Sequence, residues 1–145
     1  MSLRRADLTE AGDIARLHRF TVRTSLPFLP DIFTAEQDLA FFRDQLLANA
    51  ETWVWEEGEA ICGYVAFKPG WVEHLFIHPD HQGRGIGPAL LDKAMENGTE
   101  RRLWTFQKNA RARAFYEKRG FVIEIETDGS TNMEKEPDVL YVWRP

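Results

Sequence analysis

The sequence contains a single cysteine, Cys62, among its 145 residues. One cysteine cannot form an intrachain disulfide, which fits a reducing compartment. Long apolar runs are also missing, because the longest, such as VAF (65–67) and VLYVW (139–143), are far too short to cross a membrane. The first residues, MSLRRADLTEAGDI, carry charges where a signal peptide needs an apolar stretch. We therefore expect a cytoplasmic protein with no membrane partner.

An excess of positive charge is absent as well. The chain has 18 lysines and arginines against 23 acidic residues, a net charge of −5. This balance argues against a broad nucleic-acid-binding surface, although it leaves room for a local basic pocket. With 43% hydrophobic and 28% charged residues, the composition is that of a globular protein rather than a disordered one. We predict one domain over residues 1–145, large enough to bury a core.

Hydrophobic periodicity and turn residues predict alternating strands and helices with no repeat and no linker. Strands are expected at 2–6, three within 52–78, and at 102–106, 121–126 and 138–143. Helices are expected at 8–26, after Thr34, at 87–97 and at 110–119. Thr34 and Gln37 form the pattern of a capping box, and Gly120 suits the end of the last helix. The order β-α-α-β-β-β-α-β-α-β-β indicates an α/β protein with helices on the faces of a mixed sheet.

The stretch HLFIHPDHQGRGIGPALLDKA (74–94) is the most informative part of the chain. Glycines at 83, 85 and 87 separate an apolar strand pattern from a helix pattern, and Pro88 belongs in the first helical turn. Exposed backbone N–H groups at a helix N-terminus bind anions, and Arg84 adds a charge-assisted donor. The alternative is a loop that merely turns a corner.

Two common phosphate-binding motifs do not fit this stretch. A Walker A loop requires Gly-Lys-Ser/Thr at its end, where this chain has Gly87-Pro88-Ala89. A dinucleotide-binding fingerprint requires a third glycine where Leu90 stands, and it normally follows the first strand.

The stretch instead resembles motif A of the GCN5-related N-acetyltransferases, Gln/Arg-x-x-Gly-x-Gly/Ala, which Gln82-Gly83-Arg84-Gly85-Ile86-Gly87 matches throughout. Downstream, NARARAFYEKRGF (109–121) is similar to the helix that follows that family's fifth strand. The resemblance covers nearly the whole chain. It implies a mixed, mostly antiparallel sheet of about seven strands with about four helices, and acetyl-CoA as cosubstrate.

The resemblance also assigns cofactor contacts. It places the pyrophosphate of coenzyme A on the glycine loop, and the pantetheine arm along the backbone of the preceding strand. The residues that it implies for the loop are Gln82, Gly83, Arg84, Gly85, Ile86, Gly87 and Pro88, and those for the strand are Leu75, Phe76 and Ile77. Asn109 matches an asparagine that hydrogen-bonds the cofactor, and it also suits a plain helix N-cap.

Tyr116 matches the tyrosine that lies near the cofactor sulfur in this family. Acetyl transfer from a thioester expels a thiolate, and a phenol, with an ordinary pKa of about 10, remains protonated at neutral pH and can donate to it. The alternative role for Tyr116 is packing under the helix, beside Phe115 and Ala112.

The acceptor amine must lose a proton before it attacks, and Glu73 is the candidate base or water relay. Many family members carry an acidic residue at its position, whereas an acidic base that some carry on the next strand is replaced here by Trp104. Glu73 is alternatively a solvent-facing carboxylate or the partner of a nearby arginine. His74 is a further candidate for proton transfer if it faces the cleft.

No metal site is expected, because His74, His78 and His81 lack a fourth ligand at a recognisable spacing. We expect an N-acetyltransferase that acts on a small-molecule or peptide amine as a monomer or homodimer. A coenzyme A-binding module without transferase activity, or use of another acyl donor, are the alternatives. The resemblance implies that the apolar stretch at 24–42 and the acidic loop at 127–138 border the acceptor site, without naming the acceptor.

Overall fold

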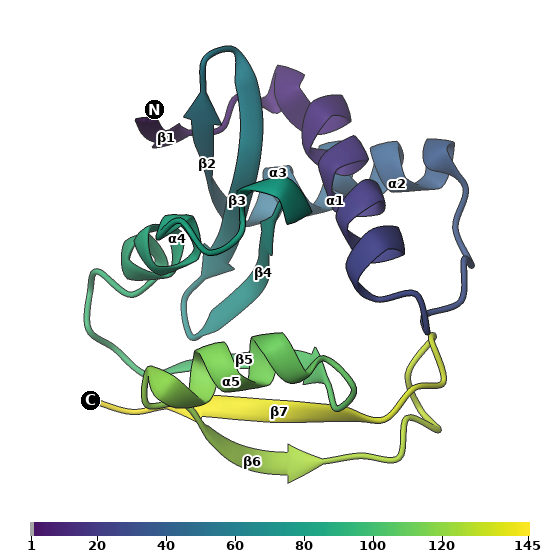
Figure 1. Ribbon diagram of the computed structural model, residues 1–145, viewed down its shortest axis with the longest axis vertical. Coiled ribbons are helices and arrows are strands. Elements are labelled where there is room, and N and C mark those ends of the chain that lie inside the picture. The colour runs from purple at the N-terminus through teal and green to yellow at the C-terminus, as the bar shows by residue number, and fades with distance from the viewer. Residues whose placement is uncertain (1) are drawn as a thin grey trace. The chain divides into compact units, whose positions relative to one another are not determined.

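The computed structural model describes residues 2–145 and confirms the expected order of elements (Figure 1). The strands are β1 (Ser2–Arg5), β2 (Glu51–Glu57), β3 (Ala60–Lys68), β4 (Trp71–Ile77), β5 (Arg101–Phe106), β6 (Val122–Glu126) and β7 (Asp138–Trp143). The helices of more than one turn are α1 (Ala11–Ser25), α2 (Ala35–Phe41), α4 (Ile86–Ala94) and α5 (Ala110–Lys118). Shorter helical segments are η1 (Leu8–Glu10), η2 (Phe42–Leu46), α3 (Leu47–Asn49) and η3 (Pro79–His81).

The strands hydrogen-bond in the order β1-β2-β3-β4-β5-β7-β6, so the predicted fold class is confirmed. Strands β1, β2 and β3 pair antiparallel, as do β5, β7 and β6, whereas β4 pairs with β5 in parallel through Trp71 and Arg102. Within residues 2–145, no helix is long and apolar enough to span a bilayer.

The chain divides into two compact units. The first runs to Lys68 and resumes at Val72–Glu96, and the second comprises Pro69–Trp71 and Asn97–Pro145. The expectation of one domain over 1–145 stays a prediction.

Reciprocal caps start two helical segments of the first unit, η1 and α2. The predicted capping box is confirmed, because Gln37 N donates to Thr34 Oγ1 at 3.1 Å and Thr34 N donates to Gln37 Oε1 at 2.8 Å. A second box, which the sequence analysis did not identify, joins Asp7 and Glu10 before α1. The two boxes satisfy backbone N–H groups that would otherwise lack partners at the helix ends.

The core of the first unit lies between α1 and the strands β2 and β3. Ile14 and Leu17 recur at helical spacing on α1 and pack with Phe42, Val54 and Tyr64. All five are at most 7% exposed. Because successive side chains of β3 point to opposite faces of the sheet, Gly63, which precedes Tyr64, lies on the other face. A Cβ atom there would meet Leu90 of α4. The sheet is therefore covered on both faces within this unit.

Helix α5 packs on β7 in the second unit. Tyr141, which is fully buried on β7, accepts a hydrogen bond from Arg113 Nε at 3.1 Å and donates to a carboxylate oxygen of Glu117. The helix gives way to Gly120, whose φ of +92° is the left-handed conformation that a helix-ending glycine adopts. The predicted end of this helix is confirmed.

Gly63 provides a stability test of this packing. A Cβ atom there would lie 2.8 Å from Ile77 Cδ1 and 3.1 Å from the backbone oxygen of Phe76. Because backbone cannot yield easily in a close-packed interior, we expect Gly63→Ala to lower the free energy of unfolding by about 1–3 kcal/mol. Urea denaturation with a linear extrapolation measures the change.

Gly12→Ala in α1 is the matched control. Its new Cβ atom would meet only the guanidinium end of Arg16, at 3.4 Å. A helical alanine is more favourable than glycine by roughly 0.5–1 kcal/mol, so this variant should gain stability. Equal stability of the Gly63→Ala variant and the parent protein would show that the contact between β3, β4 and α4 is looser than described.

Candidate active site

The glycine loop joins η3 to α4 in the first unit. Gly83 and Gly85 have φ angles of +80° and +84°, a conformation that side chains with a Cβ atom rarely adopt. Gly85 is the N-cap of α4, and Pro88 falls in the first turn, as predicted. Gly87 differs from the other two glycines, because it lies inside the helix and has no positive φ.

Two glycines of this loop face open space. A Cβ atom built on Gly83 or on Gly85 would meet no other atom within 4 Å. The loop is held from below instead, because Gln82 Nε2 donates to the backbone oxygen of Ile77 at 3.0 Å and Ile86 is 2% exposed. The backbone at the start of α4 is therefore fixed in shape and accessible to an anion.

Arg84, predicted to contact that anion, points to two side chains of the protein. Its Nη1 atom lies 3.4 Å from His81 Nδ1 and 3.7 Å from Glu57 Oε2. The side chain is 57% exposed, so leaving these partners for a phosphate would require no unpacking.

Strand β4 presents its two faces differently. Phe76 and His74 lie on the face toward α1, where the ring of Phe76 is 4.6 Å from that of His18. Leu75 and Ile77 alternate with them, and the Cδ1 atom of Ile77 lies where a Cβ atom on Gly63 would clash. A ligand along Leu75, Phe76 and Ile77 would thus use their backbone rather than the side chain of Phe76.

Glu73 is an ion-paired, partly exposed carboxylate in this structure. Its Oε1 atom lies 3.0 Å from Lys68 Nζ, and 32% of its side chain is exposed. The partner is a lysine at the end of β3 rather than the arginine considered from the sequence. Its role as a base stays a prediction.

His74 does not share the exposed face of Glu73. Its Nδ1 atom lies 2.8 Å from the hydroxyl of Tyr64, and both residues belong to an aromatic cluster with His18, Phe42 and Phe76. Burial lowers the pKa of His74 to about 3 and that of His18 to about 4, so both imidazoles are neutral at physiological pH. This cluster was missed in the sequence, because its residues are spread over four elements.

Tyr116 lies in the second unit and is 7% exposed. Its ring makes edge contacts with Phe115 and Phe121 at centroid distances of 5.2 and 5.5 Å. Burial raises the pKa of its phenol, so the hydroxyl remains protonated throughout the physiological range. Tyr116 therefore has the packing role that was considered as the alternative. Its hydroxyl is also protonated, which is the state that a general acid requires.

Asn109 begins α5 in the second unit. Its side chain accepts a hydrogen bond from the backbone N–H of Ala112 at 3.2 Å, so the interpretation as an N-cap is confirmed. A contact between Asn109 and the cofactor stays a prediction. Trp104, at the position where some family members carry an acidic base, is 48% exposed on β5.

The three histidines considered from the sequence do not form one group. His74 is bonded to Tyr64, whereas the ring of His78 stacks on Phe20 at 5.0 Å and lies 5.5 Å from that of His81. Their separation follows from the pleat of β4 and from the turn that begins after Ile77.

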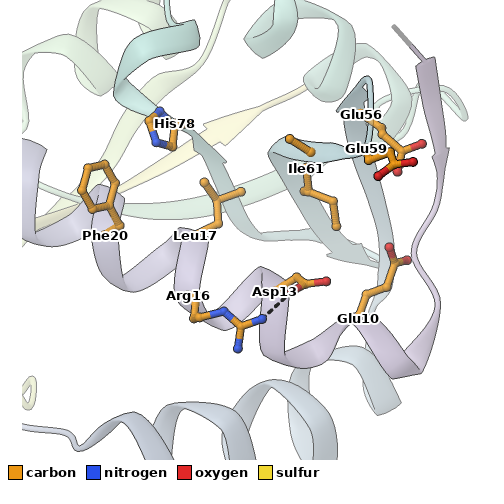
Figure 2. Close-up of a pocket in the computed structure, with 10 residues that line it drawn as sticks. Glu10, Asp13, Arg16, Leu17, Phe20, Glu56, Glu59, Ile61 and His78 are labelled. Atoms are coloured by element: carbon orange, nitrogen blue, oxygen red, sulfur yellow. Dashed lines mark hydrogen bonds and ion pairs between the residues drawn. The ribbon is translucent and has the colours of Figure 1, made fainter.

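A groove of about 370 Å³ lies in the first unit, between α1 and the turn that joins β2 and β3. Figure 2 shows the residues that line it. None of the predicted site residues lines it. Most of its carboxylates already have cationic partners, because Glu10 and Glu56 bind Arg4 at 2.6 and 2.8 Å and Asp13 pairs with Arg16. The two ion pairs of Arg4 connect β1 with η1 and with β2. We therefore interpret the residues of this groove as holding these elements together.

The part of the chain that contains the glycine loop matches a known protein family. Residues 17–121 match the model of the acetyltransferase (GNAT) family. The chain is 39% identical over 82 residues to the peptidyl-lysine N-acetyltransferase YiaC of Escherichia coli K12, a match that spans 56% of each protein and so little more than half of that relative.

Two solved structures share the fold. The apo form of YjaB from Escherichia coli has a TM-score of 0.79 at 23% identity, covering 98% of this chain and 96% of that one. YncA from Salmonella typhimurium, solved with its cofactor acetyl-CoA, has a TM-score of 0.74 at 20% identity, covering 98% and 91%. The family match, which includes the glycine loop and the whole of α5, together with this fold, establishes that the chain belongs to the acetyltransferase (GNAT) family.

Proposed function

We propose that this protein is an N-acetyltransferase that transfers the acetyl group of acetyl-CoA to a primary amine. The observation that carries the proposal is the glycine loop, with left-handed Gly83 and Gly85, open space above both, and the start of α4 behind them. An acetyl-CoA-bound structure of the same fold supports this assignment of the cosubstrate.

The residues predicted to hold the cosubstrate fit its chemistry. The N–H groups at the start of α4 would face the pyrophosphate, and Arg84 would leave Glu57 to add a charge-assisted contact. The backbone of Leu75, Phe76 and Ile77 would pair with the amide groups of the pantetheine arm in the manner of an added strand.

Two residues would move the protons. The amine nitrogen forms a bond to the thioester carbonyl carbon, and the carbon–sulfur bond breaks. Glu73, directly or through water, takes a proton from the acceptor ammonium before attack, and Tyr116 gives its proton to the departing thiolate. The second proton, which the nitrogen loses as the amide forms, passes through solvent to the Tyr116 phenolate and restores the phenol. The role of Tyr116 uses the phenol in the protonation state that it needs, because the raised pKa keeps it neutral until it donates.

The acceptor would be an amine carried on an apolar group. The segment that contains the end of α1 and α2 exposes a set of large apolar side chains at its surface: Phe20, Ile32, Phe33, Leu39 and Phe41. Where exposed apolar side chains lie together, they mark a binding surface. A lysine side chain of a peptide, the acceptor type in the name of YiaC, suits such a surface, and so does a small apolar amine.

Gly85 tests the proposed cosubstrate site. We expect Gly85→Asp to reduce the affinity for coenzyme A at least about tenfold, or about 1.4 kcal/mol, because a carboxylate would face the phosphates. Gly85→Asn is the control of the same shape, and both residues tolerate a left-handed backbone better than most. The aspartate variant should bind more weakly than the asparagine variant, since only it adds charge.

Isothermal titration calorimetry on folded protein gives both affinities. If the Gly85→Asp variant bound coenzyme A as tightly as the parent protein, the pyrophosphate would lie elsewhere and the proposed site would be wrong.

A further inference from the structure

Three potential metal ligands meet beneath the glycine loop. Glu57 ends β2, Cys62 lies on β3 and His81 ends η3, one residue before Gln82. One ligand atom from each lies within 4.8 Å of the other two, and over residues 2–145 no other group of histidine, cysteine and acidic residues is gathered in this way. The three come from separate elements of the first unit, so the fold rather than local sequence brings them together.

The spacing of the three fits a small tetrahedral ion. His81 Nδ1 lies 3.3 Å from Glu57 Oε2. Zinc–nitrogen and zinc–oxygen bonds of about 2.0 Å at a tetrahedral angle place those two atoms about 3.3 Å apart. A thiolate at about 2.3 Å from the ion would lie roughly 3.5 Å from each, so closing the cluster needs a movement of at most about 1.3 Å.

The cluster is also open to solvent on one side. The side chains of His81 and Glu57 are 27% and 28% exposed, whereas Cys62 is 2% exposed at the inner end. An ion can therefore enter past the imidazole and the carboxylate and reach the sulfur last.

We propose that Glu57, Cys62 and His81 form a site for zinc or an ion of similar softness, with a fourth position open to water. A thiolate, an imidazole and a carboxylate together favour zinc over magnesium and calcium, which prefer oxygen ligands alone. Binding replaces the proton of the Cys62 thiol, which is released to solvent. None of the three residues is among those proposed for acetyl transfer.

A cation already occupies the mouth of this cluster. The Nη1 atom of Arg84 lies beside both His81 Nδ1 and Glu57 Oε2, at 3.4 and 3.7 Å. Zinc must displace it, so removal of the arginine should strengthen metal binding. The position of Arg84 on the glycine loop means that metal binding would also change a residue of the proposed coenzyme A site.

Cobalt(II) is the probe that tests the proposal, because its absorption spectrum reports both geometry and thiolate ligation. Reduced, metal-free, full-length protein is titrated with cobalt(II) and then with zinc. We expect one ion for each chain, a tetrahedral visible spectrum with a thiolate charge-transfer band, and displacement of the cobalt by zinc.

Variants assign the ligands. Cys62→Ser should abolish the charge-transfer band, and Cys62→Ser and His81→Asn should each weaken cobalt binding at least about tenfold. Arg84→Gln should strengthen it. His78→Asn is the control, because asparagine also suits the helix-capping position that His78 holds at η3, and it should leave cobalt binding unchanged.

A spectrum without a thiolate band, or equal cobalt affinity in the parent and in both ligand variants, would overturn the proposal. It would leave Glu57, His81 and Arg84 as a group that only anchors the loop. The titration needs no coenzyme A, so its result is independent of the proposed acetyl transfer.

Discussion

Turnover by the Tyr116→Phe variant should fall by about 10²–10⁴-fold, while its affinity for coenzyme A changes little. The substitution deletes one hydroxyl and keeps the ring that packs against Phe115 and Phe121. Because burial raises the pKa of this phenol, the parent enzyme always holds the proton that the thiolate needs. Without it, the thiolate must leave unprotonated or wait for water.

Tyr141→Phe is the matched control for this experiment. The ring of Tyr141 also lies near that of Tyr116, with their centroids 6.4 Å apart. Its hydroxyl, however, binds Arg113 and Glu117. Loss of that hydroxyl should cost stability, by about 1 kcal/mol, and little turnover. Rates are compared where the chemical step limits turnover. Full turnover by Tyr116→Phe under those conditions would make Tyr116 a packing residue only.

The Glu73→Gln variant should lose roughly 10²-fold or more in rate at neutral pH, and the deficit should shrink as the pH rises. An alkyl ammonium with a pKa near 10 is free base in only about one part per thousand at pH 7, so a base is needed there. Near the pKa of the amine, solvent supplies the free base and the carboxylate matters less. The measurement is a pH–rate profile of both proteins on one amine.

Lys68→Gln separates the carboxylate from its ion pair. It removes the ammonium that lies 3.0 Å from Glu73 and leaves the carboxylate in place, so the rate should be largely kept. A glutamate that only attracts the cationic acceptor would give a different result, because its loss would mainly raise KM at every pH. Parallel profiles with a constant offset would contradict the assignment of Glu73 as a base.

Local signals in the sequence predicted most of the fold. Thr34 and Gln37 predicted their capping box, and Gly120 predicted the end of α5. Each of these features depends on residues a few positions apart, so a single short stretch carries the information.

Features that depend on contacts between elements were not predictable in the same way. The pairing of Glu73 with Lys68 depends on how β3 and β4 are joined, and the bond between His74 and Tyr64 depends on their register. The approach of Glu57, Cys62 and His81 likewise requires three elements to fold together. One local feature was also missed. The helix after Thr34 continues into a π-helical turn at Phe42–Leu46, and a regular hydrophobic period of 3.6 residues does not indicate such a turn.

The glycine loop falls between these two cases. Its position at the start of α4 was predicted from the sequence, whereas the different backbone conformations of its glycines were not. Gly83 and Gly85 supply the left-handed turns, and Gly87 is helical, so its small size rather than its backbone freedom would matter at the proposed site.

The most direct test of the proposed acetyl transfer is to incubate the protein with acetyl-CoA and a panel of amines, including lysine peptides and small apolar amines. The readouts are release of free thiol and the mass of the product. We expect release of thiol that requires an amine, with one acetyl group added to that amine for each thiol formed. Binding of acetyl-CoA without amine-dependent release of thiol would contradict the account and would identify a coenzyme A-binding module instead.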